Sequence, residues 1–254
     1  MSYESYDKLK GIIIREVNYG ESDKILTVLT EKEGKITISA KGARRNKSGI
    51  SAASSIMCYS EFTLYKGKSM YILNGIDIIE QFYNIRNDLD SLTYASYFLE
   101  VVNDVVPEHQ SANDVLKLLL NCLFFIMKNE KSKLLIKIIF DFRLMAIIGY
   151  APSVNECQIC NCKKESNYFS YSICGLICED CIKGKEHEHS TYISKGSILA
   201  LNHILSSKIN DLFSFNVSNY VLIELKKISK QYIKDRMEKN YKTINLLDKI
   251  ANSE

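Results

Sequence analysis

The sequence predicts an α+β protein of several domains, with a small N-terminal β-barrel followed by helices and a cysteine-rich insert. Three observations support this fold class. Apolar and polar residues alternate through the first eighty residues, as in strands, and glycines bound the alternating segments. From about residue 84 the apolar residues recur at helical spacing, and six of the eight cysteines fall between Pro152 and His189. We therefore expect domain boundaries that give the segments 1–80, 81–150, 151–189 and 190–254.

Five segments of the first domain have strand periodicity, and we expect strands over 9–17, 25–30, 35–41, 58–65 and 70–79. In the third segment Ile36, Ile38 and Ala40 alternate with polar residues, which is typical of a strand with one buried face. The long connection Gly42–Met57 follows this strand, where an OB barrel usually has its extra helix or loop. The first domain is therefore predicted to be a five-stranded OB-fold barrel.

The remaining chain is predicted to be helical, with helices from about 84 to 106, from 111 or 113 to 127, and over 134–148, 195–205 and 219–237. The second and third are apolar around most of their circumference, so we expect both in the middle of an α-helical bundle. Lys137, Asp141 and Arg143 interrupt the most apolar stretch, which argues against a membrane span and a membrane partner. Val221, Leu225, Ile228 and Tyr232 should form one buried stripe.

Composition indicates an ordinary globular protein with a slightly basic balance. Of its 254 residues 46% are hydrophobic and 25% charged, and the formal net charge is +3. The first residues, MSYESYDKLK, lack the basic and apolar pattern of a secretory leader, so the mature chain should begin near Met1. Because eight cysteines without a leader suggest a reducing compartment, a cytoplasmic location is expected.

Two C-x₂-C knuckles, Cys157/Cys160 and Cys178/Cys181, lie seventeen residues apart, a spacing typical of zinc sites. Four thiolates complete a closed tetrahedral shell, so we expect one structural Zn²⁺ in an inserted four-cysteine zinc module. Thioredoxin-like redox chemistry is the alternative function of such a motif. Four nearby residues remain as alternative ligands: Cys162, Cys174, His187 and His189.

The charge of this insert argues against DNA contact by the zinc module itself. Four basic residues stand against six acidic ones between Pro152 and His189, and four thiolates on one Zn²⁺ add negative charge. The module is therefore predicted to stabilise the fold or to contact a protein.

A cluster of cations follows the third predicted strand, where Lys41, Arg44, Arg45 and Lys47 lie within seven residues. An OB barrel that binds single strands needs such cations and exposed aromatic rings. The aromatic candidates are Tyr19, Tyr59, Phe62, Tyr65 and Tyr71. A solvated basic loop beside core aromatics is the alternative interpretation. A second basic set, between Lys226 and Lys242, is either a wet helix face or an extension of the same surface.

Catalytic motifs are missing from the sequence, so an enzyme is not expected. Gly67-Lys68-Ser69 resembles the end of a phosphate-binding loop, but Phe62 stands where that loop needs glycine. The histidines, four in number, give no obvious pair of base and nucleophile.

Several motifs together resemble the RecO family of bacterial recombination mediators over almost the whole chain. They are GIIIR at 11–15, YGESDKILT at 19–27, AKGARR at 40–45, FRL at 142–144 with GYAP at 149–152, and the knuckle pair. The sequence departs from the family at Cys162 and Cys174, positions where glycine is usual.

The resemblance implies a non-enzymatic protein of DNA repair and homologous recombination, associated with the nucleoid. It would bind single- and double-stranded DNA, anneal complementary strands, and act with RecR to load RecA onto strands coated by single-stranded DNA-binding protein (SSB), whose C-terminal tail it would contact. The implied zinc ligands are Cys157, Cys160, Cys178 and Cys181, and the implied DNA contacts are Arg15, Lys35, Lys41, Arg44, Arg45 and Lys47. A zinc-stabilised protein-interaction scaffold without direct DNA binding is the main alternative.

Overall fold

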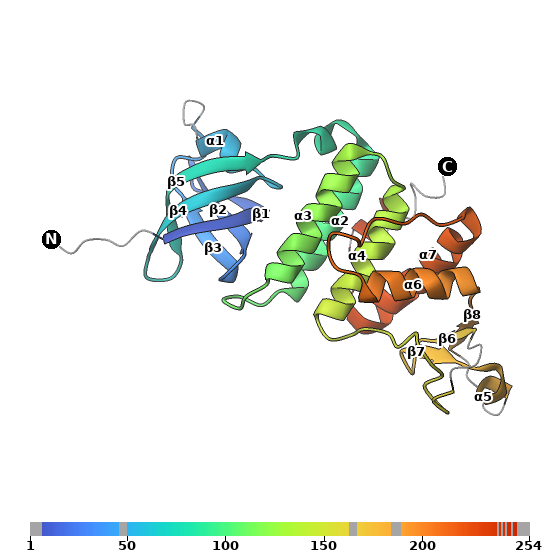
Figure 1. Ribbon diagram of the computed structural model, residues 1–254. Coiled ribbons are helices and arrows are strands. Elements are labelled where there is room, and N and C mark those ends of the chain that lie inside the picture. Colours follow the sequence, from blue (N-terminus) through green and yellow to red (C-terminus); the bar gives the residue numbers. More distant parts are fainter. Residues whose placement is uncertain are drawn as a thin grey trace. The chain divides into compact units, whose positions relative to one another are not determined.

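The computed structural model describes residues 7–45, 50–162, 167–183, 189–237, 239, 241, 243–244 and 246–247 (Figure 1). The chain forms two compact units: unit 1 comprises Met1–Lys128 with Tyr241–Glu254, and unit 2 comprises Asn129–Asn240. The domain boundaries inferred from composition stay a prediction. In the described part of the chain, no helix has both the length and the apolar character needed to cross a membrane.

Unit 1 contains the predicted five-stranded barrel. Its strands are β1 (Asp7–Tyr19), β2 (Asp23–Thr30), β3 (Gly34–Ala40), β4 (Tyr59–Lys66) and β5 (Tyr71–Glu80). The barrel closes in the order β1-β2-β3-β5-β4, with β3 and β5 parallel and the other pairs antiparallel. A short helix, α1 (Ile50–Ala53), lies in the connection between β3 and β4. This topology confirms the OB fold.

The core of the barrel follows the period-two pattern of the strands. Ile36, Ile38 and Ala40 of β3 are buried, whereas the residues between them are half-buried. They pack with inward side chains of the other strands, among them Leu26 and Phe62, both fully buried. The apolar residues of each strand therefore fill the barrel, and the residues that alternate with them face outward.

Two helices of unit 1 pack beside the barrel. After a 3₁₀ turn, η1 (Tyr83–Asn87), α2 (Leu89–Val105) begins with the Asp88 carboxylate accepting the Ser91 N–H, and α3 (Asn113–Lys128) packs against α2. The α2–α3 connection lies on the β3 edge, where Glu108 pairs with Gly34. Gly34 has a φ of +60°, and a Cβ there would lie 1.8 Å from the Gln110 carbonyl oxygen, so glycine is required.

The C-terminal segment returns to unit 1 and contacts α2. The Tyr241 hydroxyl donates to Asp104 at 3.0 Å, and its ring packs edge-on against Tyr97. The Thr243 hydroxyl donates to Glu100 at 2.6 Å. Unit 1 is therefore assembled from two segments that lie far apart in the sequence.

Unit 2 is a helical bundle with a small sheet. Its long helices are α4 (Lys133–Ile147), α6 (Lys195–Ser206) and α7 (Asn219–Met237). Its sheet has the order β7-β6-β8, formed by β6 (Tyr168–Ser170), β7 (Gly175–Ile177) and β8 (Ser190–Tyr192), and α5 (Glu179–Lys183) follows β7. The predicted stripe of α7 is buried against α4 and α6.

The two most apolar helices do not share one bundle as predicted, because they belong to different compact units. α3 packs with α2 in unit 1, whereas α4 packs with α6 and α7 in unit 2. An apolar circumference indicates that a helix is buried, but it carries no information about which helix buries it.

Asp141 anchors α7 to α4 inside unit 2. Its side chain is 1% exposed, receives the Lys137 ammonium at 2.5 Å, and accepts a hydrogen bond from the buried Ser229 hydroxyl. Replacing Asp141 with alanine removes the buried carboxylate that Lys137 and Ser229 both contact, and we expect a loss of about 3 kcal/mol in the free energy of unfolding. Ser229→Ala removes one hydrogen bond to a carboxylate and should cost less, about 1.5 kcal/mol. Urea unfolding of both variants checks this order, and equal losses would contradict it.

Candidate nucleic-acid interface and metal centre

Arg15 is exposed because β1 contains a bulge. The pairing of β1 with β2 is regular up to Ile13 and Val28, and then shifts so that Arg15 lies opposite Thr27. In a regular strand Arg15 would point the same way as Ile13, a residue of the barrel core. The bulge thus turns Arg15 to the outer face of the barrel, where its side chain is exposed.

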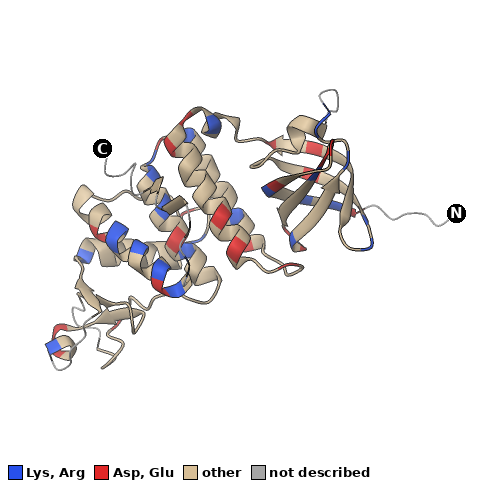
Figure 2. Cartoon of the chain, turned by 180° about the vertical axis from the view of Figure 1, so that it is seen from behind, with Lys and Arg blue, Asp and Glu red and all other residues tan. Residues whose placement is uncertain are grey.

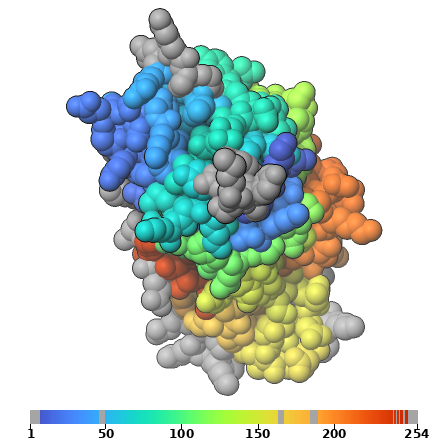
Figure 3. All heavy atoms as spheres, turned by 90° about the vertical axis from the view of Figure 1, so that its left-hand side faces the viewer, coloured from blue at the N-terminus to red at the C-terminus, as the bar shows by residue number. Residues whose placement is uncertain are grey.

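Beyond the bulge, one face of β1 combines a cation with apolar groups. Arg15, Val17 and Tyr19 alternate along this face, and Val17 and Tyr19 are 45% and 65% exposed. From Arg15 to Tyr19 the strand spans about 13 Å. Figure 3 views the chain from the barrel side, where blue and cyan atoms of the strands lie at the surface.

The basic loop Lys41–Arg45 folds back onto the turn between β1 and β2. The Arg44 N–H donates to the Ser22 carbonyl at 2.9 Å, and its guanidinium donates to the Gly20 carbonyl at 3.1 Å. Arg45 donates its N–H to the Gly42 carbonyl at 3.0 Å. These contacts bring the exposed cations Lys41, Arg44 and Arg45 to the end of β1 at which Tyr19 lies.

Asp23 fixes the start of this loop. Its carboxylate accepts the Gly42 N–H at 2.8 Å and the Ser22 hydroxyl at 3.1 Å. The Gly42 N–H, the Ser22 hydroxyl and the charges of Lys41 and Arg45 lower the pKa of Asp23 below its ordinary value of 3.8. Asp23 is therefore a positioning residue for the basic loop, and the sequence signal for it was its place in the YGESDKILT motif.

The anchoring of the loop by Asp23 should depend on the charge of its carboxylate. Because the folded pKa is lowered, the stabilisation is complete above the unfolded value and is lost as the pH falls through the folded one. We expect Asp23→Ala to accelerate hydrogen exchange of the Gly42 amide, and Asp23→Asn, which keeps an acceptor oxygen, to do so less. Identical exchange in wild type and Asp23→Ala would contradict this role.

The remaining DNA-contact candidates differ in their surroundings. Lys35 is half-buried, and its ammonium donates to the Asn103 carbonyl near the C-terminal end of α2 at 2.7 Å, where the helix dipole favours a cation. It therefore joins α2 to the barrel, and its contact with DNA stays a prediction. Lys47 lies outside the described residues.

Only part of the aromatic set is available to a nucleic acid. Tyr19 is exposed, and Tyr59 and Tyr65 are half-buried. Phe62 and Tyr71 lie in the barrel core, with 0% and 6% exposure, so the prediction that they can stack on bases is wrong. Their positions on the inward face of their strands explain the difference.

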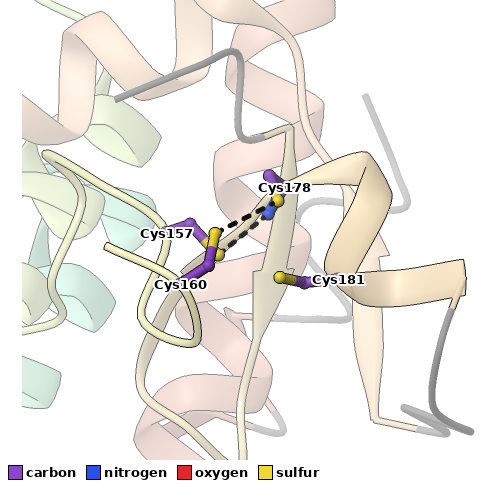
Figure 4. A group of neighbouring side chains, drawn as sticks. All are labelled: Cys157, Cys160, Cys178 and Cys181. Carbon is purple, nitrogen blue, oxygen red and sulfur yellow. Dashed lines mark hydrogen bonds between the residues drawn. The ribbon is translucent and has the colours of Figure 1, made fainter. Parts of the chain in front are cut away.

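The four knuckle cysteines come together in unit 2 and could hold a metal ion. The Sγ atoms of Cys157, Cys160, Cys178 and Cys181 all lie within 4.8 Å of one another. Figure 4 shows two sulfur atoms from each knuckle converging on a common centre. The Cys160 and Cys178 sulfurs are 3.7 Å apart, close to the separation of about 3.8 Å that follows from tetrahedral Zn–S bonds of about 2.3 Å.

Backbone hydrogen bonds hold the two knuckles in register. The Gln158 N–H donates to the Leu176 carbonyl at 2.9 Å, and the Cys178 N–H donates to the Cys157 sulfur at 3.3 Å. Burial raises the pKa of the Cys157 thiol, but the N–H groups of Cys160, Cys178 and Ile159 outweigh it and bring this pKa to about 6. Donors aimed at sulfur favour the thiolate, which is the form that binds metal.

Among the alternative ligands, two described residues have other partners. The Cys174 thiol contacts the Arg236 guanidinium and the Tyr171 carbonyl, and the His189 ring nitrogen lies 3.1 Å from the Asp235 carboxylate. Cys162 packs against the cluster but is not one of its four members. Cys174 has a φ of +61°, a left-handed conformation that favours glycine. His187 lies outside the described residues.

Comparison with known proteins identifies the family. A model described as "Recombination protein O N terminal" matches residues 1–82, and one described as "Recombination protein O C terminal" matches residues 86–244. A DNA repair protein RecO of Acetivibrio thermocellus is 46% identical over 244 residues, covering 96% of each chain. The RecO of Alkaliphilus metalliredigens is 34% identical, covering 96% of this chain and 99% of its own, and that of Clostridium perfringens is 32% identical, covering 93% and 95%. With the barrel, the helices and the cysteine cluster in place, these matches show that the chain belongs to the RecO family of DNA repair and recombination proteins.

Proposed function

We propose that this protein is a non-enzymatic mediator of DNA repair and homologous recombination. It binds single- and double-stranded DNA, anneals complementary strands and, with RecR, promotes loading of RecA on SSB-coated single strands. The relatives that resemble it along their whole length are named DNA repair proteins, which supports this role. Neutralising phosphates and aligning strands requires no bond chemistry, so an annealing protein needs no catalytic residue.

The observation that carries the proposal is the basic loop anchored beside Tyr19. Exposed guanidinium groups at Arg44 and Arg45 suit phosphate oxygens, and an exposed ring at Tyr19 suits a base. Arg15 extends the cationic surface along β1 over about 13 Å, which spans several nucleotides of a strand. Lys41, Lys35 and, from the sequence, Lys47 are the further proposed DNA contacts, and Lys35 also joins α2 to the barrel.

One Zn²⁺ in the cysteine cluster is the proposed cofactor, with Cys157, Cys160, Cys178 and Cys181 as its ligands. A four-sulfur shell leaves no position for substrate, so the ion contributes to folding of the insert. DNA, RecR, the C-terminal tail of SSB and, indirectly, RecA are the proposed partners, with the protein in the cytoplasm at the nucleoid.

Fluorescence anisotropy of a labelled single-stranded oligonucleotide, titrated with the protein at several salt concentrations, tests this proposal. We expect tight binding at low salt and a linear fall of log K with log salt, because each phosphate contact releases counterions. A duplex of the same sequence should also bind. Absence of binding at low salt would overturn the proposal in favour of a protein-interaction scaffold.

A further inference from the structure

Helix α7 of unit 2 has an exposed row of residues on the face opposite its buried stripe. Tyr220, Ile223, Lys227, Lys230 and Lys234 follow one another at spacings of three and four residues, which places them on one helix face. All five side chains are exposed, and those of Tyr220 and Ile223 are 61% and 66% exposed. Figure 2 marks the lysine and arginine positions that recur along this helix. We refer to these five residues as the α7 stripe.

The two acidic residues in the described part of α7 both have hydrogen-bond partners, and Glu224 also interacts with the Tyr220 hydroxyl at the start of the stripe. The Glu224 carboxylate accepts the hydroxyls of Ser194 and Ser197 at 2.6 and 2.5 Å. Asp235 accepts the Gln231 amide at 2.7 Å and contacts His189. Within the described part of unit 2, the ion pairs include neither Lys227 nor Lys234. The stripe therefore keeps a net positive charge.

The spacing of the stripe suits a regular polyanion. Lys227 and Lys234 are seven residues apart, about 10.5 Å along the helix axis. This length corresponds to about three phosphates of one strand at an axial spacing of about 3.4 Å. Tyr220 and Ile223 continue the row with apolar surface on which bases can lie.

We propose that the α7 stripe is a second DNA-binding site, which holds a second strand while the barrel holds the first. This inference rests on the proposed function and deepens it, because annealing requires two strands on one protein. A strand site on each compact unit would meet that requirement within a single chain.

A DNA strand fits the stripe better than an acidic peptide does. The apolar groove of unit 2, of about 350 Å³, is lined by Leu199, Phe215 and Val221 and lies at the first turn of α7. The lysines lie in the following turns, up to about 20 Å farther along the helix. A short peptide seated in the groove would leave the row of cations largely uncovered, whereas a strand follows it.

The test is native mass spectrometry combined with anisotropy, using two short non-complementary single strands of different mass. Wild-type protein should form a complex of one chain with two strands. In the triple variant Lys227→Gln/Lys230→Gln/Lys234→Gln, the first strand should bind within about twofold of wild type, and the second at least about tenfold more weakly. Removal of three phosphate contacts should lower the salt slope of the second step by about 2.

Two further variants separate charge at the stripe from general effects. A scattered variant, Lys117→Gln/Lys195→Gln/Lys208→Gln, makes the same charge change at exposed positions elsewhere and should keep the second strand. Arginine at the three stripe positions keeps the charge, so this variant should also bind the second strand.

Four outcomes would overturn the inference. The first three are one strand per wild-type chain, a second strand unaffected by the triple variant, and an equal loss in the scattered variant. The fourth, from a parallel titration with an acidic peptide, is a peptide that wild type binds and the triple variant loses while it keeps the second strand. Binding of one strand but never two defeats only this inference. Absence of any binding also defeats the proposed function.

Discussion

Arg44→Ala/Arg45→Ala is expected to weaken binding of a single-stranded oligonucleotide by about tenfold or more at low salt. If each arginine neutralises one phosphate, each contact contributes about 0.7 to the slope of log K against log salt. Loss of both arginines should therefore reduce the magnitude of this slope by about 1.4. Both guanidinium groups are exposed at the end of β1, on a loop tied to the β1–β2 turn. Anisotropy titrations at several salt concentrations measure the affinity and its slope together.

A matched control lies at the other end of the same strand. Lys8→Ala/Lys10→Ala removes the same charge from exposed positions of β1, and Lys8 already pairs with Glu61 at 3.4 Å. We expect this variant to bind nearly as wild type does. Unchanged affinity and slope in the arginine variant would contradict the assignment of DNA binding to the basic loop. Equal effects of both variants would show that binding depends on net charge and not on the position of the arginines.

Removal of the proposed Zn²⁺ is expected to have the largest effect on stability. The insert is built from short strands and a five-residue helix, so the four sulfur–metal bonds should supply much of its folding free energy. A strong chelator should lower the melting temperature of unit 2 by more than about 10 °C. Differential scanning calorimetry with and without chelator checks this, and superimposable transitions would contradict it.

Two cysteine variants distinguish the ligand set from its neighbours. Cys178→Ser removes a member of the cluster and should abolish stoichiometric zinc and destabilise unit 2. Cys174→Ser changes a nearby thiol outside the cluster and should keep one zinc per chain. Because the insert has more acidic than basic residues, we expect Cys178→Ser to change DNA affinity by less than about threefold. Zinc retained by Cys178→Ser, or lost by Cys174→Ser, would refute the ligand assignment.

Much of the fold could be predicted because its signals are local. Strand alternation gave all five barrel strands to within two residues at each end, as in β3, where the prediction was 35–41 and the strand is Gly34–Ala40. The helical period gave α7 over Asn219–Met237, with its buried stripe. The paired C-x₂-C spacing indicated the four-cysteine cluster, because a two-residue spacer lets both sulfurs turn to one centre.

The sequence by itself determined the five barrel strands, the long helices and the two knuckles, since side-chain size, polarity and spacing act within a few neighbouring residues. Only the tertiary structure decided that a bulge turns Arg15 outward, that Lys35 is held by α2, and that Asp23 anchors the basic loop. It also decided that α3 and α4 belong to different units. Each of these depends on partners far apart along the chain, and the choice of partner is made when the chain packs, which no local pattern encodes.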